Sequence, residues 1–251
     1  MSEIIIKPGE RLDDLQRDGL KILQRPGSFR FGTDAVLLSD FALIRPRDRV
    51  ADFGTGTGVI ALLLCARHPG IKVNALEIQE DVADMACRSV ALNGLSDKIT
   101  VLNADIKDAP KLLGYGQTDH IVCNPPYFKP GAALTPENEN KRISRLEGEI
   151  SISELCVSAA QTLKSGGRLS VVFPAMRMFE MMTAMHSAAL APKRVRTVHG
   201  TSAHAPRLIL LDAVKHGGSQ LDWLPPLILS NPDGSPTEEW NRIYAKSDVR
   251  K

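Results

Sequence analysis

The sequence lacks the features that mark membrane and secreted proteins. No apolar run in its 251 residues approaches the roughly 20 residues that a membrane-spanning helix needs. The N-terminus has only the three-residue run Ile4, Ile5 and Ile6, too short for the core of a signal peptide. Internal repeats and low-complexity tracts are also lacking. We therefore expect a cytoplasmic protein with no membrane partner.

Neither an excess of charge nor a cysteine framework singles out a partner. The net charge is +2, from 31 basic and 29 acidic residues, so binding to nucleic acid would depend on local basic clusters. His199 and His204 lack partner ligands, so no metal is expected. The cysteines contain no C-x-x-C pair, which argues against a zinc site or disulfides. We expect four buried, reduced thiols, namely Cys65, Cys87, Cys123 and Cys156.

Strand-like and helical segments alternate between residues 48 and 214. Helices are predicted at 58–68, 79–94, 152–167 and 175–190, and strands at 49–54, 71–78, 99–105, 118–123, 168–174, 194–199 and 207–214. Such alternation indicates an open, mostly parallel α/β sheet. Several strands are continuously apolar, which is typical of a sheet with helices on both faces. The pattern predicts one large α/β domain over residues 48–216.

Three segments lie outside this alternation. Residues 1–47 form an N-terminal extension, expected to pack on the ligand site, in which Asp34 could cap a short helix. Residues 128–150 form a long polar loop within the domain, of a length that is uncommon unless the loop is functional or disordered. Residues 217–251 are predicted to be a strand–turn–helix appendage whose helix starts at Ser235.

The segment DFGTGTG, residues 52–58, joins the first predicted sheet strand to its helix. Gly54, Gly56 and Gly58 follow G-x-G-x-G spacing and lack the G-x-G-x-x-G spacing of dinucleotide-binding loops. Such glycines permit a tight turn and a close approach of ligand to a helix N-terminus. Asp52 places a negative charge where a pyrophosphate would lie. The loop therefore favours an amino-acid-bearing nucleotide such as S-adenosylmethionine.

Acidic residues also end the next two predicted strands. Glu77 follows Gly58 by 19 residues, the offset at which a carboxylate can hold ribose hydroxyls. Asp105 ends the third strand, where it could accept a hydrogen bond from an adenine amino group. Ligands of open parallel sheets bind outside the carboxyl ends of the strands. We therefore expect Asp52, Glu77, Asp105 and Asn124 to share one cofactor site.

The tetrapeptide NPPY, residues 124–127, follows the fourth strand. An exocyclic amine is a poor nucleophile because its lone pair is delocalised. Asn124 Oδ1 and the Pro125 carbonyl could each accept one N–H and direct that lone pair toward a methyl donor. The prolines fix the backbone, and Tyr127 with Phe128 can stack on a flat substrate. The motif predicts N-methylation of a planar NH₂ group without an ionised base.

The order of the segments GSFRFGTD, DFGTGTG, ALE, NAD and NPPYF resembles the class I S-adenosylmethionine-dependent methyltransferases. It is most similar to the bacterial tRNA adenine-N6 methyltransferase family, which modifies an adenine near the anticodon of a valine tRNA. The resemblance covers nearly the whole chain and implies a Rossmann-like fold with a mostly parallel seven-stranded sheet. It further implies S-adenosylmethionine as cofactor and RNA, foremost tRNA, as substrate. The residues that it implies are Asn124, Pro125 and Tyr127 in catalysis, and Thr33, Asp52, Gly54, Gly56, Gly58, Glu77, Asp105 and Asn124 in cofactor binding.

Substrate contacts are expected from Pro126 and Phe128 and from Arg142 and Arg145 in the loop 128–150. The family often has Arg-His-Glu after the catalytic loop, whereas this chain has Leu146 in the run SRLEGE, which bears on substrate specificity. A further basic group could grip RNA phosphates or be scattered solvated charge, and the sequence leaves both interpretations open. Its members are Lys193, Arg194, Arg196 and Arg207.

The motif defines the acceptor chemistry, and the acceptor itself has alternatives. A glutamine N5-methyltransferase of the release-factor type would use the same motif, as would enzymes that methylate adenine in DNA or guanine in ribosomal RNA. A release-factor enzyme is expected to carry a helical domain before the glycine loop, and only 47 residues precede the segment DRVADFG here, which favours nucleic acid. A catalytically silent module that binds S-adenosylmethionine or RNA is a third hypothesis. A homodimer is left open.

Overall fold

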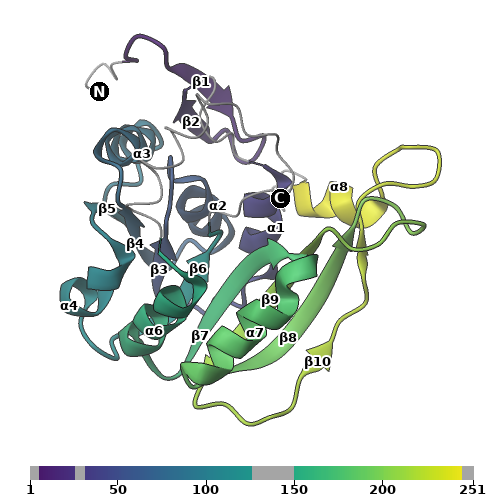
Figure 1. Cartoon of the computed structure of the whole chain (residues 1–251). Helices are drawn as coiled ribbons and strands as arrows, with labels where there is room; N and C mark the ends of the chain where they lie inside the picture. Colours follow the sequence, from purple (N-terminus) through teal and green to yellow (C-terminus); the bar gives the residue numbers. More distant parts are fainter. Residues whose placement is uncertain (1–5, 26–31, 126–149, 245–251) are drawn as a thin grey trace, which may run out of the picture.

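The computed structural model describes residues 6–25, 32–125 and 150–244 and confirms the α/β prediction (Figure 1). The seven predicted strands form one sheet, in which β9 alone runs antiparallel to its neighbours. Two short parallel strands, β10 (Asp222–Trp223) and β11 (Leu227–Ile228), extend it beside β8. The spatial order of the seven is β5 (Ile99–Asn103), β4 (Lys72–Glu77), β3 (Arg49–Phe53), β6 (Thr118–Cys123), β7 (Leu163–Pro174), β9 (Leu208–Lys215) and β8 (Leu190–His199).

The strand order reverses at β3, which pairs with β4 on one side and with β6 on the other. Phe53, the last residue of β3, lies opposite Leu76 of β4 and Cys123 of β6. The carboxyl ends of these three strands therefore meet at one edge of the sheet. Open α/β sheets bind ligands at such a switch point.

Helices cover both faces of the sheet, as continuously apolar strands require. One face packs against α1 (Thr33–Phe41), α2 (Val59–Arg67) and α3 (Glu80–Leu92). The other packs against α4 (Ala109–Leu113), α6 (Ile152–Thr162) and α7 (Met178–Ser187). Along β6, Val122 faces the first layer while Ile121 and Cys123 face the second, because successive strand residues point to opposite faces.

The N-terminal extension contributes a hairpin of β1 (Arg11–Asp14) and β2 (Lys21–Gln24) that packs on α3. The Leu23 amide donates to Ser89 Oγ at 3.0 Å, and the Lys21 amide donates to Asn93 Oδ1 at 2.9 Å. Helix α8 (Glu238–Tyr244) packs beside α1 (Figure 1). Arg67 of α2 donates to the Ile243 carbonyl at 2.8 Å, which ties the C-terminal appendage to the core.

Several predicted helix ends are wrong. Helix α8 begins at Glu238 and not at Ser235, because the Thr237 hydroxyl accepts from the Trp240 amide while Ser235 bonds Asp233 in the preceding turn. Asp34 lies in the first turn of α1 and does not cap it, since the N-cap is Gly32. Helix α6 ends at Thr162, so residues 163–167 belong to the irregular start of β7 and not to the helix.

Side-chain burial corrects the cysteine prediction. Cys87 is exposed on the outer side of α3, whereas the other three cysteines are buried and all four are free. In α7, Met181 and Met185 are fully buried, whereas Met176 of the preceding turn is exposed. Throughout the three described ranges, no helix is long and apolar enough to cross a membrane.

Candidate active site

The glycine loop leaves the carboxyl end of β3 through backbone angles that favour glycine. Gly54, Gly56 and Gly58 have φ values of 70°, 57° and 95°, in the left-handed region where a Cβ is strained. Gly58 is also the N-cap of α2. The Thr55 amide donates to the Leu76 carbonyl at 2.9 Å, which fastens the loop to β4. The loop therefore presents the start of α2 to the switch point.

Asp52 is fully buried beneath this loop. Its Oδ2 accepts from the Thr55 hydroxyl at 2.6 Å, while its Oδ1 has no hydrogen-bond partner among the described residues. Burial raises the pKa of Asp52 to about 7, although the Thr55 hydroxyl and, to a smaller extent, the nearby Ala61 amide act in the opposite direction. A buried acceptor without a donor is costly unless a ligand supplies the donor. This environment therefore suits a ligand that carries an ammonium group.

Glu77 holds the loop and the end of β4 together. Its Oε2 accepts from the Gly56 amide and its Oε1 from the Gln79 amide, both at 3.0 Å. The backbone of Glu77 is fixed in turn by Asn103, the residue opposite it on β5. Asn103 Nδ2 donates to the carbonyls of Glu77 and Ile78 at 2.9 and 3.0 Å. Three neighbouring strand ends are thus joined through two polar side chains.

Sequence reasoning missed Asn103 and Thr55 as members of this site. Both lie inside the quoted segments NAD and DFGTGTG, next to residues that were selected for their charge. Asn103 had a usable signal, because it ends the strand after Glu77 and adjacent parallel strands place such residues side by side. Thr55 had another, because it follows Asp52 by three residues within the same tight loop.

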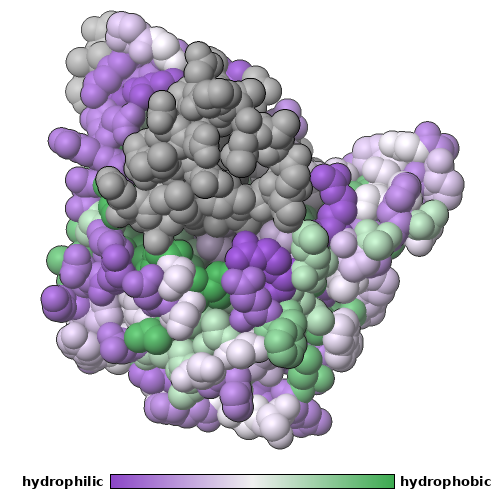
Figure 2. Space-filling model, in the orientation of Figure 1, coloured by the Kyte–Doolittle hydropathy of each residue, from purple (hydrophilic) through white to green (hydrophobic). Residues whose placement is uncertain are grey.

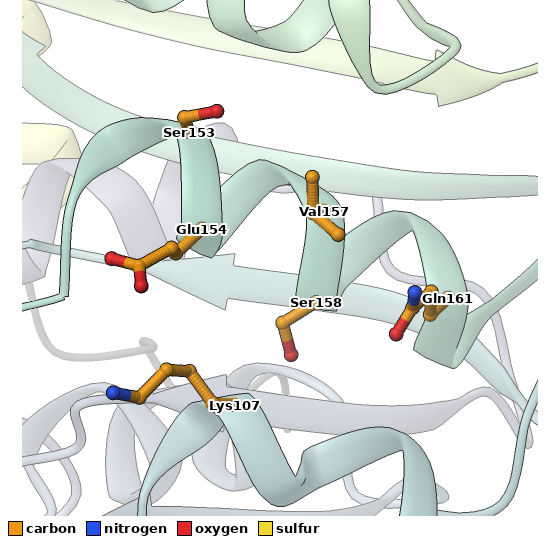
Figure 3. Close-up of a pocket in the computed structure, with 6 residues that line it drawn as sticks. All are labelled: Lys107, Ser153, Glu154, Val157, Ser158 and Gln161. Carbon is orange, nitrogen blue, oxygen red and sulfur yellow. The ribbon is translucent and has the colours of Figure 1, made fainter.

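Asp105 lies two residues beyond β5, at the same edge of the sheet. Its Oδ1 accepts from the Lys107 amide at 2.9 Å and caps the short helix η1 (Ile106–Asp108), and its Oδ2 lies 3.2 Å from Lys107 Nζ. A shallow groove of about 210 Å³ separates Lys107 from α6 (Figure 3). The groove does not include the strand-end residues of the candidate site. It is lined by Lys107, Ser153, Glu154, Val157, Ser158 and Gln161.

Asn124 and Pro125 follow β6 directly at the switch point. Asn124 Oδ1 is buried and has no hydrogen-bond partner within the described part of the chain, and Pro125 is buried. Thr33 is exposed at the start of α1, where its hydroxyl contacts Asp34 Oδ1 at 3.2 Å. The remaining predicted site residues lie outside the described residues, namely Pro126, Tyr127, Phe128, Arg142, Arg145 and Leu146.

The basic group near the last strands is mostly used within the protein. Arg194 lies over the Phe41 ring at 4.5 Å, and Lys193 Nζ donates to the Gln220 carbonyl at 3.0 Å. Arg196 makes a bidentate contact with Glu239, with both distances at 2.8 Å. In the described ranges, no cluster of three or more His, Cys, Asp or Glu could hold a metal ion.

Glycine loops in dinucleotide-binding sheets face a pyrophosphate, whereas here the buried carboxylate of Asp52 stands at that place. With an Asn-Pro segment at the adjacent strand end, this arrangement is that of a class I, S-adenosylmethionine-dependent methyltransferase. The chain belongs to the methyltransferase small domain family, whose sequence profile matches residues 27–191.

Similar proteins confirm the resemblance that the sequence motifs indicate. A Porphyromonas gingivalis protein named tRNA1(Val) (adenine(37)-N6)-methyltransferase is 32% identical over 189 residues, which cover 73% of this chain and 73% of the relative. A Photorhabdus laumondii protein of that name is 30% identical over 240 residues, which cover 91% of this chain and 94% of the relative.

Solved structures show the same fold. A predicted O-methyltransferase from Agrobacterium tumefaciens superposes with a TM-score of 0.69 at 23% identity, covering 86% of this chain and 100% of that one. Geranyl diphosphate C-methyltransferase from Streptomyces coelicolor superposes with a TM-score of 0.53 at 14% identity, covering 72% of this chain and 76% of that one. The predicted Rossmann-like methyltransferase fold is thereby confirmed.

Proposed function

We propose that this methyltransferase transfers the methyl group of S-adenosylmethionine to the exocyclic N6 of an adenine in RNA, with tRNA as the substrate. The observation that carries the proposal is the buried Oδ1 of Asn124 at the switch point, which has no hydrogen-bond partner among residues 6–25, 32–125 and 150–244. An amide oxygen in that state is an acceptor that awaits a donor, and a planar NH₂ group supplies one. The relatives named for tRNA adenine-N6 methylation support RNA as the carrier of that NH₂.

The cofactor is proposed to lie across the carboxyl ends of β3, β4 and β5. Asp52 would receive the ammonium group through its free Oδ1, and the glycine loop would pass beneath the methionine part. Glu77 would accept from the ribose hydroxyls, since a carboxylate oxygen that binds one amide retains a second lone pair. Asp105 would face the adenine amino group. Thr33 and the extension 1–47 are proposed to pack on this site, and residues 217–251 to form a separate C-terminal appendage.

Bound at this site, S-adenosylmethionine supplies an activated methyl group on its sulfonium. Asn124 Oδ1 and the Pro125 carbonyl would each accept one N–H group of the target amine and so orient its nitrogen lone pair. The cofactor would supply the methyl group and leave as S-adenosylhomocysteine, and the methylated nitrogen would release one proton to water. Tyr127 is proposed to stack on the flipped base, with Pro126, Phe128, Arg142 and Arg145 as further substrate contacts. A cytoplasmic location follows from this substrate.

The test compares the wild-type protein with Asn124→Ala, using unmodified bulk tRNA and methyl-labelled S-adenosylmethionine. The variant should lower kcat by at least a hundredfold, the size that loss of one transition-state hydrogen-bond partner gives. Its Kd for S-adenosylmethionine should stay within about threefold, because Asp52 and Glu77 are intact. Asn93→Ala, at the C-cap of α3 where Asn93 accepts from the Lys21 amide of the hairpin, is the matched control and should retain kcat. Weak cofactor binding together with normal turnover in Asn124→Ala would contradict the assigned role.

A further inference from the structure

Strand β7 continues beyond the end of its neighbour β6. Cys123, the last residue of β6, lies opposite Val171, and β7 runs on through Val172, Phe173 and Pro174. Three strand residues rise by about 10 Å. The segment after β7 therefore projects past Asn124 and Pro125 at the carboxyl edge of the sheet, beside the proposed substrate site. This segment is the short helix η2 (Ala175–Arg177) followed by α7.

The segment formed by η2 and α7 exposes two large apolar side chains. Phe179 and Met176 are 83% and 76% exposed, the highest values among the large hydrophobic residues of the described chain. Met176 lies in η2, and Phe179 lies three residues further along the chain, in the first turn of α7. Figure 2 shows hydrophobic residues along α7 next to a strongly hydrophilic patch. A single exposed apolar residue needs no explanation, but a pair at the rim of an active site indicates a contact.

Positive charge accompanies this apolar pair. The guanidinium of Arg177 lies 5.1 Å from the centroid of the Phe173 ring and makes a bidentate contact with Glu180, which holds it in one position. The Arg207 carbonyl accepts from the Ala175 amide at 3.0 Å, so β9 begins directly beside η2. The Arg207 side chain is exposed and makes no ion pair or side-chain hydrogen bond within the described part of the chain.

We propose that Phe179, Met176 and Arg207 form a docking surface for an unpaired nucleotide that neighbours the target adenine in RNA. Phe179 stacks on the base, Met176 packs at its edge, and Arg207 pairs with the adjoining phosphate. An exposed aromatic ring, together with an exposed guanidinium that makes no ion pair within the described ranges, complements a base and its phosphate, whereas an apolar peptide would leave Arg207 without a partner. This inference rests on the proposed function, because it presumes RNA at the neighbouring site.

The test measures binding of a fluorescein-labelled RNA hairpin, with an unpaired adenine in its loop, by fluorescence anisotropy. Phe179→Ala should raise the Kd about tenfold, the size of one lost base–aromatic stack, and Phe179→Leu should do the same. Phe179→Trp should bind like the wild type, because the aromatic face is kept. Arg207→Ala should weaken binding and lower the salt slope of log Kd by about 0.7 to 1, as loss of one phosphate contact does.

Two control variants have matching chemistry at the opposite edge of the sheet. Tyr115 is 61% exposed before β6, and Arg45 is exposed before β3. Tyr115→Ala and Arg45→Ala should leave the hairpin Kd within twofold, and every variant should keep its Kd for S-adenosylmethionine. Wild-type affinity in both Phe179→Ala and Arg207→Ala, or an equal loss in the controls, would overturn the docking surface.

The binding readout separates this inference from the proposed function. Hairpin binding that depends on Phe179 and Arg207, without methyl transfer to any RNA, would support the surface and refute the proposed activity. Methyl transfer to RNA with unchanged binding in both variants would support the activity and refute the surface. A wild-type protein that binds no hairpin would refute the docking surface outright.

Discussion

The protonation of Asp52 gives opposite pH trends to folding stability and to cofactor binding. Its pKa of about 7 in the folded state lies above the value of 3.8 expected for an unburied aspartate. Because the folded-state pKa is raised, the stability that protonated Asp52 contributes to the ligand-free protein is fully present below pH 4 and is lost as pH rises through 7. Between pH 5 and pH 7 the loss from this carboxyl is about 2 kcal/mol.

Cofactor affinity should change in the other direction over the same interval. An ammonium group binds the ionised carboxylate, and with a pKa of about 7 roughly 1% of Asp52 is ionised at pH 5 and half at pH 7. Since apparent affinity scales with the competent fraction, the Kd for S-adenosylmethionine should be more than tenfold weaker at pH 5. Asp52→Asn should bind weakly at both pH values.

The assay pairs urea unfolding of the ligand-free protein with calorimetric titration of S-adenosylmethionine, each at pH 5, 6 and 7. Asp52→Asn serves as the reference in both, because other titrating groups affect the two proteins alike. His120, whose pKa is lowered to about 3 by burial, is one such group. A wild-type Kd that is constant from pH 5 to pH 7, or an Asp52→Asn variant with wild-type affinity, would refute the ammonium–carboxylate pairing.

Three further variants separate positioning from stability. Asn103→Ala removes both hydrogen bonds that fix the end of β4, so KM for S-adenosylmethionine should rise about tenfold with little change in kcat. An unchanged KM in steady-state assays would count against this role. Gly56→Ala should lower the free energy of unfolding by about 1 to 2 kcal/mol in urea titrations, because its φ is 57°, and Gly70→Ala, outside the left-handed region, should not. Arg168→Ala leaves the carboxylate of Asp212 buried without the guanidinium that pairs with it, so the free energy of unfolding should fall by about 3 to 5 kcal/mol. The KM for S-adenosylmethionine should stay constant, and a change in KM would link this ion pair to the site.

The regular part of the fold was predictable because hydrophobic pattern and glycine placement act locally. The strand predicted at 118–123 has the bounds of β6 itself. Gly94, the last residue of the helix predicted over 79–94, has a φ of 64° just after α3 ends at Leu92. Prediction failed where a long-range contact sets the end of an element. The start of β7 at Leu163 is set by pairing with Thr118 of β6, which no pattern inside residues 152–167 reveals.

The candidate site was predictable as a set of strand ends but not as a network. Charge and position were enough to select Asp52 and Glu77, and the structure places both at the glycine loop. The partners that hold them are neutral side chains, Thr55 and Asn103, and their role depends on which strands become neighbours. The same limit applies to Arg196, whose place in an apparent basic cluster gave no sign of its contact with Glu239.

The most direct test of the central claim is nucleoside analysis by mass spectrometry of unmodified tRNA after reaction with the protein and S-adenosylmethionine. We expect N6-methyladenosine to appear in the digest, to rise with time to a constant amount per tRNA, and to be missing with Asn124→Ala. A methyl group recovered on glutamine of a release factor, on DNA or on ribosomal RNA, with none on tRNA adenine, would contradict the proposed substrate.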